Sequence, residues 1–440
     1  MEKMLDKIMS VLGKSEYPLH DCRENCKMIY YENSSEEEFE TLIKFFKSED
    51  FEALQERELY SNSFALLRKE SLSVTALFTP CDSSLRVTVS ENASFPSFER
   101  ASFEEKCSPV FYCFENDQTL IDCGMCLLIQ CSDYSFFVVD SGHYLQINDN
   151  DRIHKFMRER TPEGQKIVIA GWLITHAHSD HISKLIDFLR YNCDDVIIEG
   201  FYSNLIPHDY GREFWDFEET VLAAKFFHIL ESFNAPKIKL HTGQHFYIRN
   251  LEIDVLGTHE DIYPKEICDY NDSSCIITVT VDGTKIFIPG DASALSSEKL
   301  EARYGENLKC DIVQIAHHGH IGISEKAYEL IAADVAVFPI TRIKFEEECP
   351  RISANRKAIE IADSYYISSD GTVEIPLPYE RGNIKQHPDE TFEDFEKIKR
   401  LWGYDYTDAY KCKLYDIYVG NGGNLDNAVL PVTYKGTFSM

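Results

Sequence analysis

The chain has 440 residues, of which 44% are hydrophobic and 12% aromatic, and its formal net charge is −30. This composition is typical of a packed globular protein of two or three domains, and it excludes a largely disordered chain. The acidic balance disfavours long DNA or RNA as a partner. No apolar run of about 18 residues is present, so we expect no membrane contact, and without a signal-like start we expect a cytoplasmic protein with free thiols.

The first hundred residues predict a small α+β unit. Apolar residues recur at helical spacing over residues 36–58, which predicts one helix there. Three strand-like runs follow at residues 63–70, 73–80 and 84–90. A polar stretch then ends the unit near residue 105, so we expect an accessory domain over 1–105.

From about residue 110, apolar strands alternate with amphipathic helices. Residues 125–142 predict a β-hairpin, residues 166–175 a buried strand, and residues 182–192 and 220–233 helices. Residues 275–291 predict a second hairpin, in which Asp282-Gly283 suits a two-residue type I′ turn. This alternation predicts mixed sheets covered by helices, an α/β (α+β) fold over 106–380. A C-terminal extension over 381–440 is expected to pack on this domain, with a helix at 391–403 and strands at 413–420 and 428–436.

The strongest chemical signal lies where the predicted strand at 166–175 meets the next helix. His176, His178, Asp180 and His181 follow one another within six residues of the sequence LITHAHSDH. Imidazole nitrogens with an anionic oxygen are the ligands that zinc and iron prefer. The pattern therefore predicts a metal site at this edge of the sheet.

This motif resembles the metal-binding signature of the metallo-β-lactamase superfamily, and further pieces follow in that family's order. Asp140 in FVVDSG resembles the aspartate that orients the His-rich loop, and Asp291 in IFIPGD resembles the carboxylate that bridges two metals. His317 and His318 in AHHG resemble the last ligand motif and, in particular, the ComEC-type branch. The resemblance covers residues 110–377 and implies an αββα sandwich with a dinuclear centre.

The resemblance implies these metal ligands: His176, His178, Asp180, His181, Asp291 and His317. It implies two divalent metal ions, of which zinc is our first expectation and iron or manganese the alternatives. Because successive strand residues point in opposite directions, we expect only one residue of the His317-His318 pair at the metals, and we choose His317. Asp180 and His318 are then the candidate catalytic residues, which manage a proton or hold the leaving group.

One departure from the fullest family pattern concerns the first metal. That pattern has a separate histidine some twenty residues before the bridging aspartate, where this chain has Asn271. His259 is the nearest alternative, and water is a third. Two cysteine pairs, Cys22/Cys26 and Cys123/Cys126, have near-metal spacing but no second pair at zinc-ribbon distance, so we expect structural thiols there.

The expected activity is hydrolysis by a metal-activated water, with a small or short phosphodiester as the leading substrate. An acyl ester, thioester or lactone is the first alternative, because one metal platform serves many substrates. A metal-binding regulatory module without turnover is the second. An apolar mouth would favour the acyl substrates, and basic residues at the mouth would favour the phosphodiester.

Overall fold

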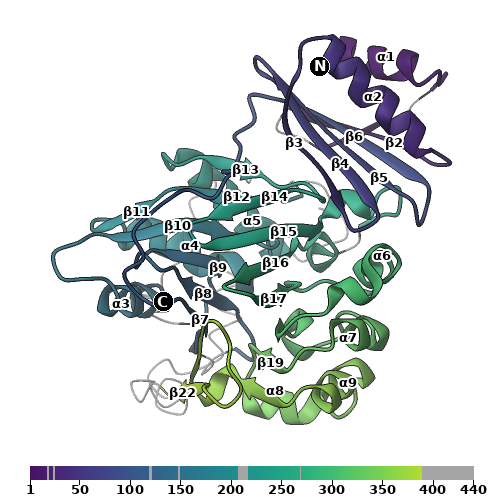
Figure 1. The fold of residues 1–440 in the computed structure, drawn as a ribbon. Coiled ribbons are helices and arrows are strands. Elements are labelled where there is room, and N and C mark those ends of the chain that lie inside the picture. Colours follow the sequence, from purple (N-terminus) through teal and green to yellow (C-terminus); the bar gives the residue numbers. More distant parts are fainter. Residues whose placement is uncertain are drawn as a thin grey trace.

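The computed structural model describes residues 1–16, 19–22, 25–117, 121–146, 149–206, 217–267 and 269–388. Within these residues, the chain forms an N-terminal sheet with its own helices and a larger body made of two stacked sheets (Figure 1). The helix and strands expected over residues 391–436 lie outside the described residues. None of the described helices is both long and apolar enough to span a lipid bilayer.

The N-terminal sheet is antiparallel, and its strands run in the order β1-β2-β6-β5-β4-β3. Its elements are α1 (Glu2–Val11), β1 (Leu19–Asp21), β2 (Cys26–Tyr31), α2 (Glu36–Ser48), β3 (Glu52–Leu59), β4 (Asn62–Lys69), β5 (Leu72–Thr79) and β6 (Ser84–Glu91). Side chains alternate between the two faces of each strand. On β6, Leu85, Val87 and Val89 pack with the helices in one apolar cluster, whereas Arg86 bonds to residues of the larger body.

The three strands predicted at residues 63–90 are confirmed, but the single helix predicted over 36–58 is wrong in its second half. A capping box at Ser35 starts α2, and the helix ends at Ser48. Residues 52–59 form β3 instead, the edge strand that pairs with β4. The helical spacing continued by chance into this strand, and pairing with β4 outweighs local preference.

The larger body consists of two mixed sheets that pack face to face. The first sheet has the order β13-β12-β10-β9-β8-β7-β21-β22, with β11 beside β10, and the second runs from β14 to β20 in sequence order. The strands of the first are β7 (Val110–Cys113), β8 (Cys126–Gln130), β9 (Phe136–Asp140), β10 (Ile167–Leu173), β11 (Val196–Ile198), β12 (Phe201–Ser203), β13 (Lys237–Lys239), β21 (Thr372–Pro376) and β22 (Lys385–His387). Those of the second are β14 (His245–Ile248), β15 (Leu251–Gly257), β16 (Ile276–Val281), β17 (Thr284–Ile288), β18 (Ile312–Gln314), β19 (Val335–Phe338) and β20 (Ser364–Ile367).

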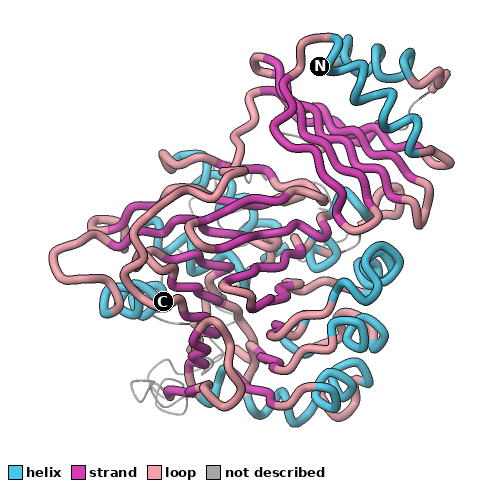
Figure 2. Tube along the Cα trace, viewed as in Figure 1, coloured by secondary structure: helices cyan, strands magenta, loops and turns pink. Residues whose placement is uncertain are grey.

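Helices cover the outer face of each sheet, which gives the αββα sandwich expected from the sequence (Figures 1 and 2). The first sheet is covered by α3 (Asp149–Glu159), α4 (Ser179–Tyr191) and α5 (Phe217–Ser232), and the second by α6 (Ala294–Tyr304), α7 (Glu325–Ile331), α8 (Arg342–Glu348) and α9 (Ser353–Ile361). Strand β9 shows how the first sheet is buried on both of its faces. Phe136 and Val138 pack in the cluster with the helices, while Phe137 and Val139 pack in the cluster between the sheets.

Both predicted hairpins are confirmed, as β8-β9 and β16-β17. Asp282 and Gly283 both have positive φ, at 48° and 89°, which is the geometry of the type I′ turn predicted for them. Strand β22 pairs with β21, so the first residues of the predicted extension join the first sheet.

Candidate metal centre

Loops from both sheets meet at one edge of the sandwich and carry the candidate residues. The loop after β10 carries His176 and His178, and α4 begins directly after it with Asp180 and His181. A backbone hydrogen bond joins this loop to the second sheet, since the backbone N–H of Cys275 donates to the Thr175 carbonyl at 2.9 Å. Gly290 has φ +59°, and a Cβ there would lie 2.9 Å from the Cβ of Thr175, so glycine permits this close approach.

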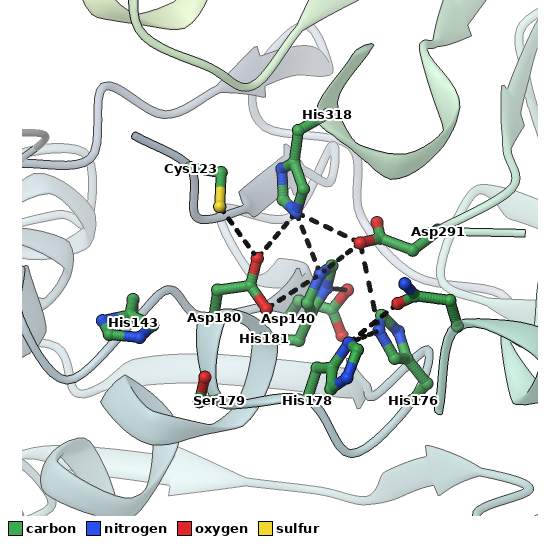
Figure 3. Close-up of polar contacts among 12 residues, drawn as sticks. Cys123, Asp140, His143, His176, His178, Ser179, Asp180, His181, Asp291 and His318 are labelled. Atoms are coloured by element: carbon green, nitrogen blue, oxygen red, sulfur yellow. Dashed lines mark hydrogen bonds and ion pairs between the residues drawn. The ribbon is translucent and has the colours of Figure 1, made fainter. Parts of the chain in front are cut away.

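Four side chains form a group that could hold a metal ion, referred to below as the buried group because three are buried and the fourth, Asp180, is only partly exposed: Asp180, His181, Asp291 and His318. His318 Nε2 lies 2.9 Å from Asp180 Oδ2 and 3.2 Å from Asp291 Oδ2. His181 Nε2 lies 3.2 Å from Asp291 Oδ2 and 3.1 Å from His318 Nε2. Figure 3 shows these polar atoms pointing toward one another.

Each histidine of this group has its other ring nitrogen engaged, which leaves Nε2 for the centre. Asp140 Oδ2 lies 2.7 Å from His181 Nδ1, and it also accepts from the Thr175 hydroxyl at 2.6 Å. The Pro339 carbonyl lies 2.9 Å from His318 Nδ1. Partners of this kind fix ring orientation and tautomer in metal-ligating histidines.

A second pair of nitrogens lies beside this group. His176 Nε2 is 3.3 Å from His178 Nδ1 and 4.0 Å from Asp291 Oδ2. Two nitrogen ligands of one tetrahedral zinc ion lie about 3.3 Å apart, so the His176 and His178 nitrogens have a suitable separation. Asn271 Oδ1 lies 2.8 Å from His178 Nδ1, on the same side of the site.

The pKa values of the histidines and the burial of Asp291 bear on whether the site can hold a cation. Burial, together with the neighbouring His181 and His178 rings, lowers the pKa of His176 well below its ordinary value, which keeps that ring neutral. Burial also acts to lower the pKa of His318, but Asp291 and Asp180 raise it to about 9. Asp291 is 1% exposed, and its Oδ1 has no hydrogen-bond partner among the described residues. A buried carboxylate oxygen without a partner is costly, so this atom fits a site built to hold metal.

The structure places the two histidines of the AHHG motif differently from our expectation. His318, not His317, joins the buried group. Strand β18 ends at Gln314, and His317 and His318 both adopt left-handed backbone conformations, with φ of 52° and 59°. The alternation of a strand therefore does not apply to this pair. His317 Nε2 lies 3.2 Å from Asn271 Nδ2, and its Nδ1 lies 2.9 Å from the Ile321 carbonyl.

His259, our alternative ligand for the first metal, lies elsewhere. Its Nε2 is 2.9 Å from Asn204 Oδ1, and it does not belong to the buried group. Asn271 and water remain the candidates at that position.

Two residues near the site were not expected from the sequence. Cys123 Sγ lies 3.4 Å from Asp180 Oδ2, although we expected only a structural thiol there. Glu219 of α5 accepts from the Ser179 backbone N–H and from its hydroxyl, both at 2.6 Å, and so caps the start of α4. The spacing of the Cys123/Cys126 pair does not indicate this contact and Glu219 belongs to no motif, because both contacts join segments distant in the chain.

Comparisons with known proteins add the following findings. No protein-family model and no curated protein sequence matches the chain. Among solved structures, it is similar to the metallo-β-lactamase fold protein YhfI from Bacillus subtilis, with 10% identity, a TM-score of 0.34, and 59% of this chain and 95% of that chain covered. It is also similar to CmlA, a diiron β-hydroxylase from Streptomyces venezuelae, with 11% identity, a TM-score of 0.38 and coverages of 63% and 55%. A long form RNase Z from yeast matches with 8% identity, a TM-score of 0.38 and coverages of 67% and 51%.

Proposed function

We propose that this protein is a metal-dependent hydrolase that binds two divalent ions, with zinc as the first expectation. We further propose that its substrate is a small or short phosphodiester. His176, His178 and Asp291 would hold one ion, with Asn271 or water completing it. Asp180, His181, Asp291 and His318 would hold the other. The observation that carries this proposal is the geometry of Asp291, whose Oδ2 lies 3.2 Å from His181 Nε2 and 4.0 Å from His176 Nε2, and whose buried Oδ1 has no hydrogen-bond partner among the described residues.

Bound divalent ions would supply a water of lowered pKa and neutralise charge on the attacked oxygen. The residues of the chain would orient the ligands and transfer the proton. Asp140 and the Pro339 carbonyl orient His181 and His318 through their Nδ1 atoms. His317 lies outside the buried group and is partly exposed. Because its Nδ1 faces the Ile321 carbonyl, its Nε2 is the atom that would hold and transfer a proton to the leaving oxygen.

The phosphodiester part of the proposal is supported by the AHHG motif, which resembles the ComEC-type branch. The net charge of −30 favours a small diester over long nucleic acid. Hydrolysis of an acyl ester, thioester or lactone is the alternative activity of the same centre. The residual alternative is a regulatory metal-binding module, which would hold metal without turnover. A cytoplasmic location belongs to the same proposal.

The test combines metal analysis with hydrolysis assays. Metal content of the purified protein would be measured by plasma mass spectrometry, and turnover of bis-p-nitrophenyl phosphate, p-nitrophenyl acetate and a lactone would be compared with added Zn, Mn or Fe. We expect diester turnover that is lost together with metal in the Asp291→Asn variant. Turnover of the ester or lactone alone would indicate an acyl substrate instead of a phosphodiester. Bound metal with no turnover would favour the regulatory module. Full metal content in Asp291→Asn would refute the site.

A further inference from the structure

A second group of metal-ligating side chains lies where the N-terminal sheet meets the sandwich. Cys22 follows β1 and Cys26 begins β2, and each is 2% exposed. Glu260 comes from the 3-10 helix η1 (His259–Asp261), which follows β15 of the second sheet, and it is 5% exposed. One ligand atom from each of the three residues lies within 4.8 Å of the other two.

The carboxylate of this group is held on one side and lacks a partner on the other. His241 Nδ1 lies 2.9 Å from Glu260 Oε2. Glu260 Oε1 is buried and has no hydrogen-bond partner among the described residues. Native proteins seldom leave a buried carboxylate oxygen in this state, because desolvation of the charge is then uncompensated. The missing partner is therefore an observation independent of the cysteine pair.

The donor set and its charge suit zinc. Two thiolates, one carboxylate and a neighbouring imidazole are soft and borderline ligands, the kind that select Zn²⁺ rather than Mg²⁺ or Ca²⁺. Two thiolates and a carboxylate around Zn²⁺ leave one negative charge. The ammonium group of Lys239, which donates to the Cys22 carbonyl at 2.9 Å, lies close enough to offset that charge.

Solvent has a route to this group. A cavity of about 260 Å³ is lined by residues that include Cys26, Ser90, Lys239 and His241. Of the three proposed ligands, Cys26 lines this cavity, and the Ser90 hydroxyl, from another lining residue, donates to its Sγ at 3.2 Å. Such a cavity supplies both an entry path for a metal ion and room for a water molecule in the fourth coordination position.

We propose that Cys22, Cys26 and Glu260 bind one Zn²⁺ ion, which joins the N-terminal sheet to the sandwich, with Glu260 oriented by His241. This site is separate from the candidate metal centre and does not depend on the proposed hydrolase activity. The cysteine pair in the sequence supplies two of its three ligands, and the third could not be predicted because it comes from a distant segment.

The test uses Co²⁺ as a spectroscopic probe in the full chain. Cobalt bound by thiolates has a charge-transfer absorption in the near ultraviolet, and cobalt bound only by imidazole and carboxylate lacks it. We expect this absorption in the wild-type protein and its loss in the Cys22→Ser/Cys26→Ser variant. Zinc content of the protein should fall by one equivalent in the same variant.

Two control variants keep the assignment specific. Cys123 lies beside Asp180, so Cys123→Ser tests whether the absorption arises at the other centre, and exposed Cys81→Ser tests for non-specific binding. Both should retain the absorption.

No thiolate absorption in the wild-type protein would overturn the proposal, and so would its persistence in the double variant. A Cys22–Cys26 disulfide in protein purified under reducing conditions would also overturn it. If the double variant does not fold, Glu260→Gln should weaken zinc binding at least tenfold, and unchanged binding would refute the proposal.

Discussion

His317 and His318 are adjacent in the chain, but their rings contact different partners. His318 Nε2 faces Asp180 and Asp291 inside the protein, and His317 Nε2 faces the Asn271 amide. The left-handed conformation of both residues turns the backbone between them and separates the two rings. The two residues should therefore differ in function as ligand and proton carrier.

Replacing each histidine by alanine tests this difference. We expect His318→Ala to lose about one metal equivalent, because one ion would lack a ligand. His317→Ala should keep its metal and lose kcat by a factor of about 10² to 10⁴, the usual range for removing a general acid or base. Metal analysis and diester kinetics on both variants measure this. Equal metal loss in the two variants would contradict the division of roles.

Asn271 offers a second test at the scale of single residues. Its Oδ1 lies 2.8 Å from His178 Nδ1, so Asn271→Asp would place an anionic oxygen beside the first ion. We expect the affinity for that ion to rise roughly tenfold, because a carboxylate binds a divalent cation more strongly than an amide oxygen does. Competition with a chelator measures the affinity. The exposed Asn307→Asp variant adds the same charge elsewhere and should leave it unchanged.

At the scale of elements, the sequence predicted what depends on local pattern. The hairpins, α4 and the three N-terminal strands each have a short periodic signature, and all are present. Residues 52–59 were mistaken for helix because their partner β4 decides their conformation. The residues of the candidate site also divide into those that a local sequence pattern predicts and those whose position depends on tertiary contacts. The motif residues Asp180, His181 and Asp291 do lie together. That His318 rather than His317 joins them depends on φ angles, and the contacts of Cys123 and Glu260 depend on packing between distant segments.

The start of α4 is an element whose stability depends on such a contact. His178 precedes the helix and makes no side-chain cap, and Glu219 of α5 supplies the acceptors instead. We expect Glu219→Ala to lower the free energy of unfolding by about 1 kcal/mol, the typical cost of losing a helix cap. Metal retention should fall as well, because Asp180 and His181 lie in the first turn of α4. Denaturation by urea gives the first quantity.

Glu231→Ala is the matched control, because Glu231 lies on α5, as Glu219 does. Glu231 is exposed, so its removal should change stability by no more than about 0.5 kcal/mol. If the two variants are equally stable, Glu219 does not act as a cap.

At the scale of the whole molecule, ion pairs connect the N-terminal sheet to the sandwich. Arg57 of β3 lies 2.5 Å from Asp254 of β15, and Asp82 lies 2.8 Å from Lys299 of α6. Burial acts to raise the pKa of the Asp254 carboxyl, but His245 and Arg57 hold it below its ordinary value. Burial acts in the same way on Asp82, and Lys299 with two hydroxyls holds the pKa of that carboxyl well below its usual range.

The sign of the pH dependence follows from these lowered pKa values. A carboxyl whose pKa is lower in the folded state stabilises the fold above its unfolded pKa of about 3.9, and the stabilisation is lost as the pH falls further. We therefore expect the N-terminal sheet to loosen from the sandwich below about pH 4, with little change from these pairs between pH 5 and neutrality. Hydrogen exchange of β6 and of residues 92–109, followed against pH, measures this loosening.

The double variant Arg57→Met/Lys299→Met separates the two ion pairs from general acid unfolding. It lacks both cations, so its β6 amides should exchange faster than those of the wild type already at neutral pH and should respond less to acid. Lys44→Met removes an exposed pair with Glu40 within α2 and should follow the wild-type profile. If the double variant and the wild type lose protection at the same pH and to the same extent, these pairs do not hold the sheet in place. The connection would then rest on other contacts, such as the buried Arg86, which donates to the Glu260 and Asp261 carbonyls at 3.3 Å.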